Sequence, residues 1–540
     1  MLLEQLVAGS FLGGAVLASS QASPNKYVQM GFHKSRSFSS GGDSLARRAD
    51  DYLSVDVENQ QLYYSVELYV GTPPQNVSVL IDTGSSDLWL TSPDNPYCIG
   101  FKQPGSAKFA LEEKEAANAT VLTAQNAEGP TRSSKAAKAT GGHLDQFDCA
   151  LLGTFNNSES SSFKSNNTDF LTGYADNTFA SGFWGTDVVR IGDVDVSDVS
   201  LAVVNLTNST SPVLGIGMPV LESSNAGRLA AETNSSYEYD NFPVQLKNKG
   251  VIEKIAYSLF LNDSDATEGS VLFGAVDHSK YENGLFTVPM VNTYKDQGVQ
   301  HPIEFYVTMY GLGFKKDGFL NTITTTNFPV LLDSGSTTSY LPDTLVSMLA
   351  SALNATFSEK INGYTLKCPS EEDATFLSFD LGGFLIDVPL SDLVAKRHKN
   401  QCVLMVKGQG EGEGGYILGD TFLSSAYVVY DLESYEISIG QASTGDAAED
   451  IEVIKSTVPG AVRAPFYDRP WTGGTVISMS GNISTGPING SYNGMGATKP
   501  RNSSSSTTLS GNVRKNIGVA SAGMPSLVTA ILALIMSFLL

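Results

Sequence analysis

The chain contains the same short acidic motif twice. One copy reads Val79-Leu-Ile-Asp-Thr-Gly-Ser-Ser-Asp-Leu-Trp-Leu90, and the other reads Val330-Leu-Leu-Asp-Ser-Gly-Ser-Thr-Thr-Ser-Tyr-Leu341. Their aspartates, Asp82 and Asp333, lie 333 − 82 = 251 residues apart, which is far enough for each to belong to its own domain. A duplicated acid of this kind predicts two carboxylates that face each other between two similar lobes.

Each copy has the layout of a strand that delivers a carboxylate to a tight turn. The apolar triplets predict buried strands that end at the acid, and Gly84 and Gly335 permit a sharp turn. Two carboxylates about 3 Å apart cannot both ionise cheaply, so they share one proton. The charged member then serves as a general base toward water, and the protonated member as a general acid. Neighbouring hydroxyl groups that can orient the carboxylates belong to Thr83, Ser85, Ser334 and Ser336.

From about Tyr52 to about Ile439 the chain resembles the pepsin-like aspartic peptidases. Tyr174-Ala-Asp-Asn-Thr178 is similar to the flap of that family's first lobe, and Trp89 matches the tryptophan that hydrogen-bonds the flap tyrosine. A strand tyrosine with a satisfied hydroxyl is the alternative for Tyr174. The family flap usually has glycine where Ala175 and Asn177 stand, so the tip departs from the pattern.

The resemblance implies a mainly β, bilobal fold with a central cleft, and it implies roles for individual residues. Thr83 and Ser334 would brace the two acidic loops against each other. Segments 213–217 and 416–420 would pack behind the loops. Substrate or flap contacts are implied for Gly84, Gly335, Tyr174, Asp176, Thr178 and Thr337.

Composition agrees with a β protein of this size. The chain has 540 residues, of which 52 are glycine and 17% are charged. Short alternating runs, such as residues 64–70 and 427–431, predict many short strands separated by turns. The length is sufficient for several domains, and we expect catalytic lobes at residues 49–245 and 246–445.

The N-terminal residues predict secretory processing. Residues 1–22 contain an apolar run that resembles a signal peptide, although Glu4 stands where a basic residue is usual, and a buried helix is the alternative. Residues 23–48 carry five Lys or Arg and one acid, and they end in Arg47-Arg48. We interpret them as a basic propeptide with a dibasic processing site, and we expect it to occupy and neutralise an acidic cleft.

The C-terminal residues predict attachment to a membrane. Residues 446–515, and above all 473–515, have the Ser/Thr/Gly-rich composition of a stalk. Residues 516–540 end in the apolar run Leu527–Leu540, which is short for a membrane span and fits a GPI-attachment signal. A tail anchor is the alternative. Asn-x-Ser/Thr sequons between Asn76 and Asn502 predict a glycoprotein.

Four cysteines and five histidines constrain the site chemistry. The histidines are scattered and no Cys-x-x-Cys pair occurs, so we predict neither a metal site nor a cofactor. Four cysteines allow three disulfide patterns. The family resemblance implies the pairs Cys98–Cys149 and Cys368–Cys402, which suit an oxidising, secretory environment.

A long insertion, about residues 99–148, separates the first two cysteines. Its entropic cost grows only slowly with length, and it is an expected site of nicking. The insertion, the dibasic site, the stalk and the GPI tail together resemble the yapsin branch of fungal aspartic peptidases.

The yapsin resemblance implies cleavage after single or paired basic residues. A formal net charge of −22 attracts basic polypeptides and gives no reason to expect a nucleic acid partner. Asp176 is placed to meet a lysine or arginine before the scissile bond. The alternative is a carboxylate that only stabilises the flap turn.

The sequence therefore predicts a GPI-anchored aspartic endopeptidase that acts at acidic pH on cell-surface or secreted proproteins. We expect it at the plasma membrane or in the cell wall, as a monomer or a nicked two-chain form. Two alternatives stay open: a broad-specificity secreted peptidase like the candidapepsins, and a catalytically silent surface-attached binding protein. The intact motifs argue against the silent protein, and Ala175 is the feature that favours it.

Overall fold

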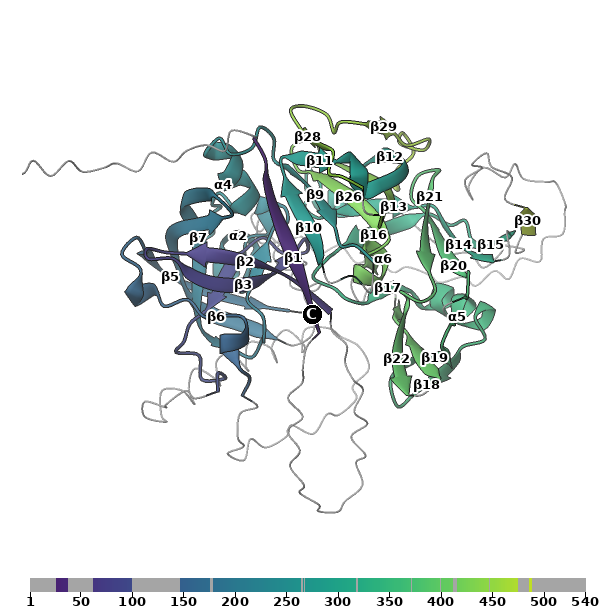
Figure 1. The fold of residues 1–540 in the computed structure, drawn as a ribbon, viewed down its shortest axis with the longest axis horizontal. Helices are drawn as coiled ribbons and strands as arrows, with labels where there is room; N and C mark the ends of the chain where they lie inside the picture. The colour runs from purple at the N-terminus through teal and green to yellow at the C-terminus, as the bar shows by residue number, and fades with distance from the viewer. Residues whose placement is uncertain are drawn as a thin grey trace, which may run out of the picture.

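The computed structural model describes residues 26–36, 62–99, 146–174, 178–263, 266, 268–316, 319–370, 372–398, 400–410, 415–445, 447–473 and 485–487. The predicted signal peptide, Arg47, Arg48, Asp176, most of the insertion and the GPI tail lie outside these residues. Figure 1 shows two strand-rich lobes, one formed by the first half of the chain and one by the second. The predicted mainly β, bilobal fold is confirmed.

Strands are the predominant secondary structure of both lobes. In the first half they are β1 (Val28–Arg36), β2 (Leu62–Val70), β3 (Gln75–Asp82), β4 (Leu88–Thr91), β5 (Lys164–Gly173), β6 (Phe179–Ile191), β7 (Val194–Thr207) and β8 (Val213–Gly215). In the second half they are β9 (Ala256–Phe260), β10 (Glu268–Phe273), β11 (Ala275–Asp277), β12 (Tyr281–Pro289), β13 (Tyr306–Met309), β14 (Gly311–Lys316), β15 (Phe319–Thr324), β16 (Phe328–Leu332), β17 (Ser339–Pro342), β18 (Thr356–Ser358), β19 (Gly363–Lys367), β20 (Phe376–Asp380), β21 (Leu385–Pro389), β22 (Val394–His398), β23 (Gln401–Leu404), β24 (Val406–Gln409), β25 (Ile417–Leu418), β26 (Ala426–Asp431), β27 (Glu436–Ala442), β28 (Ile451–Val453), β29 (Ala461–Arg463) and β30 (Thr485–Pro487).

The helices are short. They are α2 (Ser223–Ala226), α3 (Arg228–Thr233), α4 (Phe242–Asn248), α5 (Asp343–Ala352) and α6 (Asp420–Leu423), with 3-10 turns η1 (Cys149–Leu151), η2 (Asn157–Glu159), η3 (Pro219–Leu221), η4 (His278–Lys280) and η5 (Lys295–Gln297). Within the described part of the chain, no helix is long and apolar enough to cross a membrane.

One 14-stranded sheet runs through both lobes, and β1 lies at its centre. β1 pairs antiparallel with β10 of the second lobe over Val28–His33, and with β2 of the first lobe over His33–Arg36. Figure 1 shows this strand, in purple, crossing between the lobes. Residues 28–36 belong to the predicted propeptide, so its described part is a sheet strand rather than the cleft-blocking segment that we expected.

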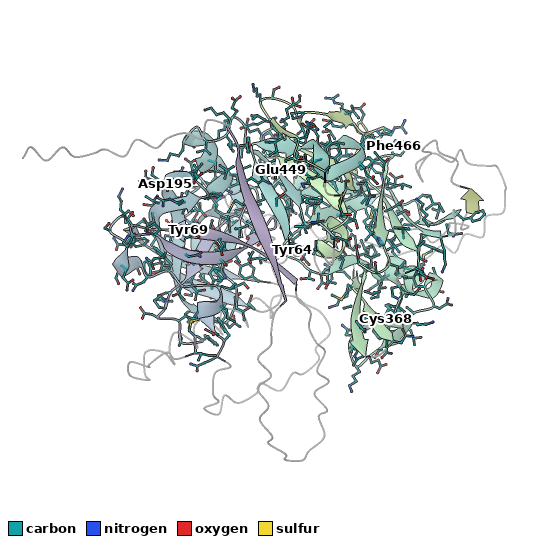
Figure 2. The ribbon with its side chains drawn as sticks, in the orientation of Figure 1. Tyr64, Tyr69, Asp195, Cys368, Glu449 and Phe466 are labelled. Carbon is teal, nitrogen blue, oxygen red and sulfur yellow. A yellow bond between two sulfur atoms is a disulfide. The ribbon has the colours of Figure 1, made fainter. Side chains whose placement is uncertain are left out.

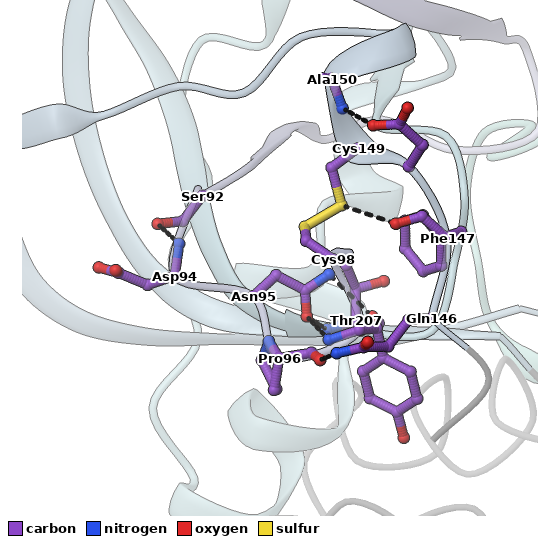
Figure 3. The surroundings of a disulfide bond; sticks show 12 residues. Ser92, Asp94, Asn95, Pro96, Cys98, Gln146, Phe147, Cys149, Ala150 and Thr207 are labelled. Atoms are coloured by element: carbon purple, nitrogen blue, oxygen red, sulfur yellow. Dashed lines mark hydrogen bonds between the residues drawn. A yellow bond between two sulfur atoms is a disulfide. The ribbon is translucent and has the colours of Figure 1, made fainter. Parts of the chain in front are cut away.

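Both predicted disulfides are present. Cys98–Cys149 holds the two ends of the insertion together, and Cys368–Cys402 connects residues near β19 and β23. Around the first bridge, the Asn95 side chain donates to the Thr207 carbonyl at 3.1 Å and accepts from the Thr207 N–H at 3.2 Å. Gln146 donates to the carbonyl of Pro96 at 3.0 Å (Figure 3). These contacts fix the base of the insertion on the first lobe.

The packed body continues past the predicted start of the stalk at residue 446. β28 pairs with β11, and β29 pairs with β12. The N–H of Phe466 donates to the Gly382 carbonyl at 2.8 Å, and Figure 2 shows Phe466 against the second lobe. Ile454 is fully buried and Val458 is nearly so. The lobe therefore extends at least to residue 473, and the predicted boundary at 446 lies too early.

Truncation tests this revised boundary. A chain that ends at residue 445 should have a lower free energy of unfolding than one that ends at 473, because it exposes the surface that Ile454 and Val458 cover. Full burial of such side chains contributes about 1.5–3 kcal/mol each. Denaturant unfolding of the two purified chains measures the difference. Equal stability would mean that residues 447–473 pack without stabilising the lobe.

Candidate active site

Each predicted catalytic aspartate lies where a buried strand ends. β3 pairs in parallel with β8, so that Asp82 is level with Gly215, and β16 pairs in parallel with β25 just before Asp333. Glycine is required at two positions behind the loops, because a side chain there would collide with the backbone of the loop in front. A Cβ on Gly215 would lie 2.6 Å from the backbone nitrogens of Ser86 and Asp87, and one on Gly419 would lie 2.1 Å from the Ser336 carbonyl oxygen. Segments 213–217 and 416–420 thus lie behind the acidic loops as predicted.

The two acidic loops meet face to face. A Cβ on Gly84 would lie 2.7 Å from Oδ1 of Asp333, and a Cβ on Gly335 would lie 2.4 Å from Oδ1 of Asp82. Such distances are too short for a real contact, so each loop needs glycine because of the other lobe's carboxyl group. The carboxyl groups of Asp82 and Asp333 are also hydrogen-bonded to each other.

Four reciprocal hydrogen bonds lock the loops together. The Ser334 N–H donates to the Thr83 hydroxyl at 2.9 Å, and the Thr83 N–H donates to the Ser334 hydroxyl at 3.2 Å. Each hydroxyl in turn donates to a carbonyl of the other lobe, at 3.1 Å to Leu332 and 3.0 Å to Ile81. Thr83 and Ser334 are each only 2% exposed. The structure therefore places both residues in the bracing position that the sequence predicts.

The surroundings of the two carboxyl groups are not equivalent. Asp82 accepts from the Gly84 N–H at 2.8 Å and from the Ser85 hydroxyl at 2.5 Å. Asp333 accepts from the Gly335 N–H at 2.9 Å. The hydroxyl of Ser336 donates to the Thr338 carbonyl at 2.9 Å and does not take the place that Ser85 has beside Asp82. The predicted support by Ser336 is therefore not seen.

This asymmetry decides which carboxyl group keeps the shared proton. Burial raises the pKa of Asp82, and hydrogen bonds from Ser85, Gly84 and Asp333 oppose that shift by stabilising its charge. Burial and the negative charge of Asp82 raise the pKa of Asp333 well above the ordinary carboxyl range. The arrangement favours an ionised Asp82 and a protonated Asp333, although the two groups titrate as a pair.

Tyr174 and Trp89 make the hydrogen bond that the family resemblance implies. The indole N–H of Trp89 donates to the Tyr174 hydroxyl at 2.6 Å, and the Tyr174 N–H donates to the Thr178 carbonyl at 2.8 Å. Thr337 lies in the loop after Gly335, where its carbonyl accepts from the Thr421 N–H at 3.4 Å. The tip of the flap, with Asp176, lies outside the described residues, so its role stays a prediction.

A third acid, Glu304, lies near the dyad and was not predicted as a site residue. Besides burial and the charge of Asp82, the charge of Glu304 also raises the pKa of Asp333. The sequence signal that could have identified it is an acid between two apolar residues, Ile303 and Phe305. An unpaired carboxyl group is costly in apolar surroundings, so its presence there indicates a special role.

The pH profile of peptide hydrolysis tests the asymmetry. Ser85→Ala removes a hydrogen bond that lowers the pKa of Asp82, so that pKa should rise and the acid limb of the kcat/KM profile should move to higher pH. Ser336→Ala is the matched control and should leave this limb in place, since its hydroxyl bonds a carbonyl group. Equal shifts in both variants would contradict the assignment.

Known proteins are similar in sequence to most of this chain. The family model described as eukaryotic aspartyl protease matches residues 63–442. The chain is 42% identical to Aspartic proteinase 3 of Saccharomyces cerevisiae, with 99% of this chain and 98% of that protein covered. It is 44% identical both to Aspartic proteinase MKC7 (87% and 82% covered) and to Aspartic proteinase yapsin-3 (85% and 81% covered) of the same yeast. Because the match spans both lobes and both acidic loops, this chain belongs to the eukaryotic aspartyl protease family.

Proposed function

We propose that this aspartic endopeptidase hydrolyses peptide bonds through Asp82 and Asp333 and prefers sites after lysine or arginine. The observation that carries the proposal is the pair of carboxyl groups held face to face by the Thr83–Ser334 hydrogen bonds. Its substrates are polypeptides, and we infer that basic proproteins at the cell surface are among them.

The geometry supports a mechanism without a covalent intermediate. Ionised Asp82 takes a proton from a water molecule as the water oxygen attacks the peptide carbonyl carbon, while Asp333 gives its proton to the carbonyl oxygen. The resulting tetrahedral diol collapses as Asp82 gives the proton that it took from the water to the amide nitrogen, one diol hydroxyl returns a proton to Asp333, and the C–N bond breaks. The flap around Tyr174 closes over the extended peptide and excludes bulk water.

A basic preference is supported by charge and by similarity. The formal net charge of −22 favours the approach of cationic peptides, and one similar yeast protein carries the name yapsin-3. Within the proposal, Asp176 on the flap meets the basic side chain that precedes the scissile bond.

The proposed location rests on features outside the catalytic body. An N-terminal apolar segment, Arg47-Arg48 and the C-terminal apolar run support a proenzyme that is secreted and then held by a GPI anchor. Two disulfides suit the oxidising secretory pathway. In this proposal, cleavage after Arg48 separates β1 from the remainder of the chain.

Hydrolysis of two peptides, one with a Lys-Arg site and one with a Phe-Phe site, tests the function between pH 3 and 7. The processed enzyme should cleave the basic peptide faster, and Asp333→Asn should abolish cleavage of both, since it removes the group that keeps the shared proton. Faster Asp333-dependent cleavage of the aromatic peptide would indicate the broad-specificity alternative. Cleavage that survives in the variant would contradict the dyad mechanism.

The role of the flap acid has its own test. Asp176→Ala should lower the ratio of basic to aromatic cleavage by at least about tenfold, the effect of losing roughly 1.4 kcal/mol of transition-state binding. Asp193→Ala, which removes an exposed acid in the turn between β6 and β7, is the matched control and should leave the ratio unchanged. An unchanged ratio in Asp176→Ala would assign the residue to the flap turn alone.

A further inference from the structure

Glu304 lies two residues before β13, and Asp333 directly follows β16, the strand that pairs with β13. β13 and β16 pair antiparallel with Tyr306 level with Leu331, and the Leu332 N–H donates to the Phe305 carbonyl at 3.2 Å. One further step along the ladder brings Glu304 level with Asp333. Directly opposite residues in an antiparallel pair have their side chains on the same face of the sheet.

That shared face is the one turned away from the core of the second lobe. Phe305 and Val307 of one strand, and Val330 and Leu332 of the other, are all fully buried in the core. Side chains alternate along a strand, so Glu304 and Asp333 are both on the opposite face. This is the face on which the first lobe presents Asp82 to Asp333.

The carboxyl group of Glu304 is incompletely paired. The Tyr294 hydroxyl is hydrogen-bonded to it, but its Oε2 atom is buried and has no hydrogen-bond partner among the described residues. None of the ion pairs in the described part of the chain includes Glu304. Burial raises the pKa of Glu304 to about 7.

A buried carboxylate without a cation is costly, and a hydrogen-bonded cation removes much of that cost. Arginine suits such a position because its planar guanidinium presents several donors in a fixed geometry. In the proposed function, peptide substrates lie beside Asp333, so a basic side chain of the substrate approaches this group during catalysis.

We propose that Glu304 is a specificity-determining residue that receives a cationic side chain of the substrate beside Asp333. The inference rests on the proposed preference for basic substrates and adds a second acidic position, on the wall of the second lobe, to the one proposed for the flap. Peptides with two basic residues would then contact both lobes, one through each acid.

Paired peptides that differ only by arginine or citrulline test the proposal. Citrulline keeps the shape of arginine but has no charge. The pair is placed in turn at each of the two positions on either side of the scissile bond, and kcat/KM is measured for the processed enzyme and for Glu304→Gln. At one position, the arginine-to-citrulline ratio should fall at least tenfold in the variant, while the ratios at the other positions stay constant.

Glu222→Gln is the matched control. Like Glu304, Glu222 has a buried carboxyl oxygen without a hydrogen-bond partner, Oε1, but it is in the first lobe and accepts from the Tyr239 N–H at 2.8 Å. In Glu222→Gln, the arginine-to-citrulline ratio of kcat/KM at every position should equal that of the wild-type enzyme.

The outcomes separate this inference from the function on which it rests. If Glu304→Gln keeps every ratio while Asp176→Ala lowers one, the flap acid alone sets the preference and the inference is wrong. If Glu304→Gln shifts the pH profile of hydrolysis without changing any ratio, Glu304 only affects the pKa values of Asp82 and Asp333. That result would also overturn the inference. If the wild-type enzyme itself shows no preference for arginine over citrulline at any position, the proposed preference for basic substrates is wrong as well.

A second measurement leaves Glu304 intact, because substitution of a partly buried group can prevent folding. In Asp176→Ala, the arginine-to-citrulline ratio at one position should rise between pH 4 and 6.5, since a carboxyl group with a raised pKa gains its charge only as the pH increases. The ratios at the remaining positions report any general effect of the dyad's charge. A ratio that stays flat at every position would contradict the proposal.

Discussion

The active site depends on four buried hydrogen bonds that Thr83 and Ser334 make across the two acidic loops. Each hydroxyl accepts from the backbone of the other lobe and donates to a carbonyl of that lobe. The hydrogen-bonding groups of either loop are therefore left without partners when the other loop is absent. A buried polar group without a partner costs about 1–3 kcal/mol of free energy. Because separation of the loops would break all four bonds, the two carboxyl groups are held in register before a substrate arrives.

Much of this site could be predicted from the sequence because its determinants are local. Asp82 and Asp333 are each marked by an apolar triplet, a hydroxyl residue and a glycine within a few positions. Trp89 and Tyr174 could be assigned from their surroundings in a family pattern, and their hydrogen bond is present. The cysteine pairs also followed from that pattern, and both bridges form.

What could not be predicted depends on pairing between distant segments. Ser336 has the same place in its motif as Ser85, yet its hydroxyl bonds the Thr338 carbonyl while that of Ser85 bonds Asp82. Glu304 is near the dyad only because β13 pairs with β16. The extension of the second lobe to residue 473 falls within the predicted stalk, and its strands β28 and β29 form by pairing with β11 and β12.

The contacts of Gly84 and Gly335 limit which substitutions each half of the chain can accept. Each glycine is confined by the carboxyl group of the opposite lobe rather than by its own strand. A side chain added at either glycine would displace the carboxyl group of the opposite loop. The two copies of the motif are therefore not independent, and a duplicated chain can diverge in sequence almost everywhere except where its halves touch.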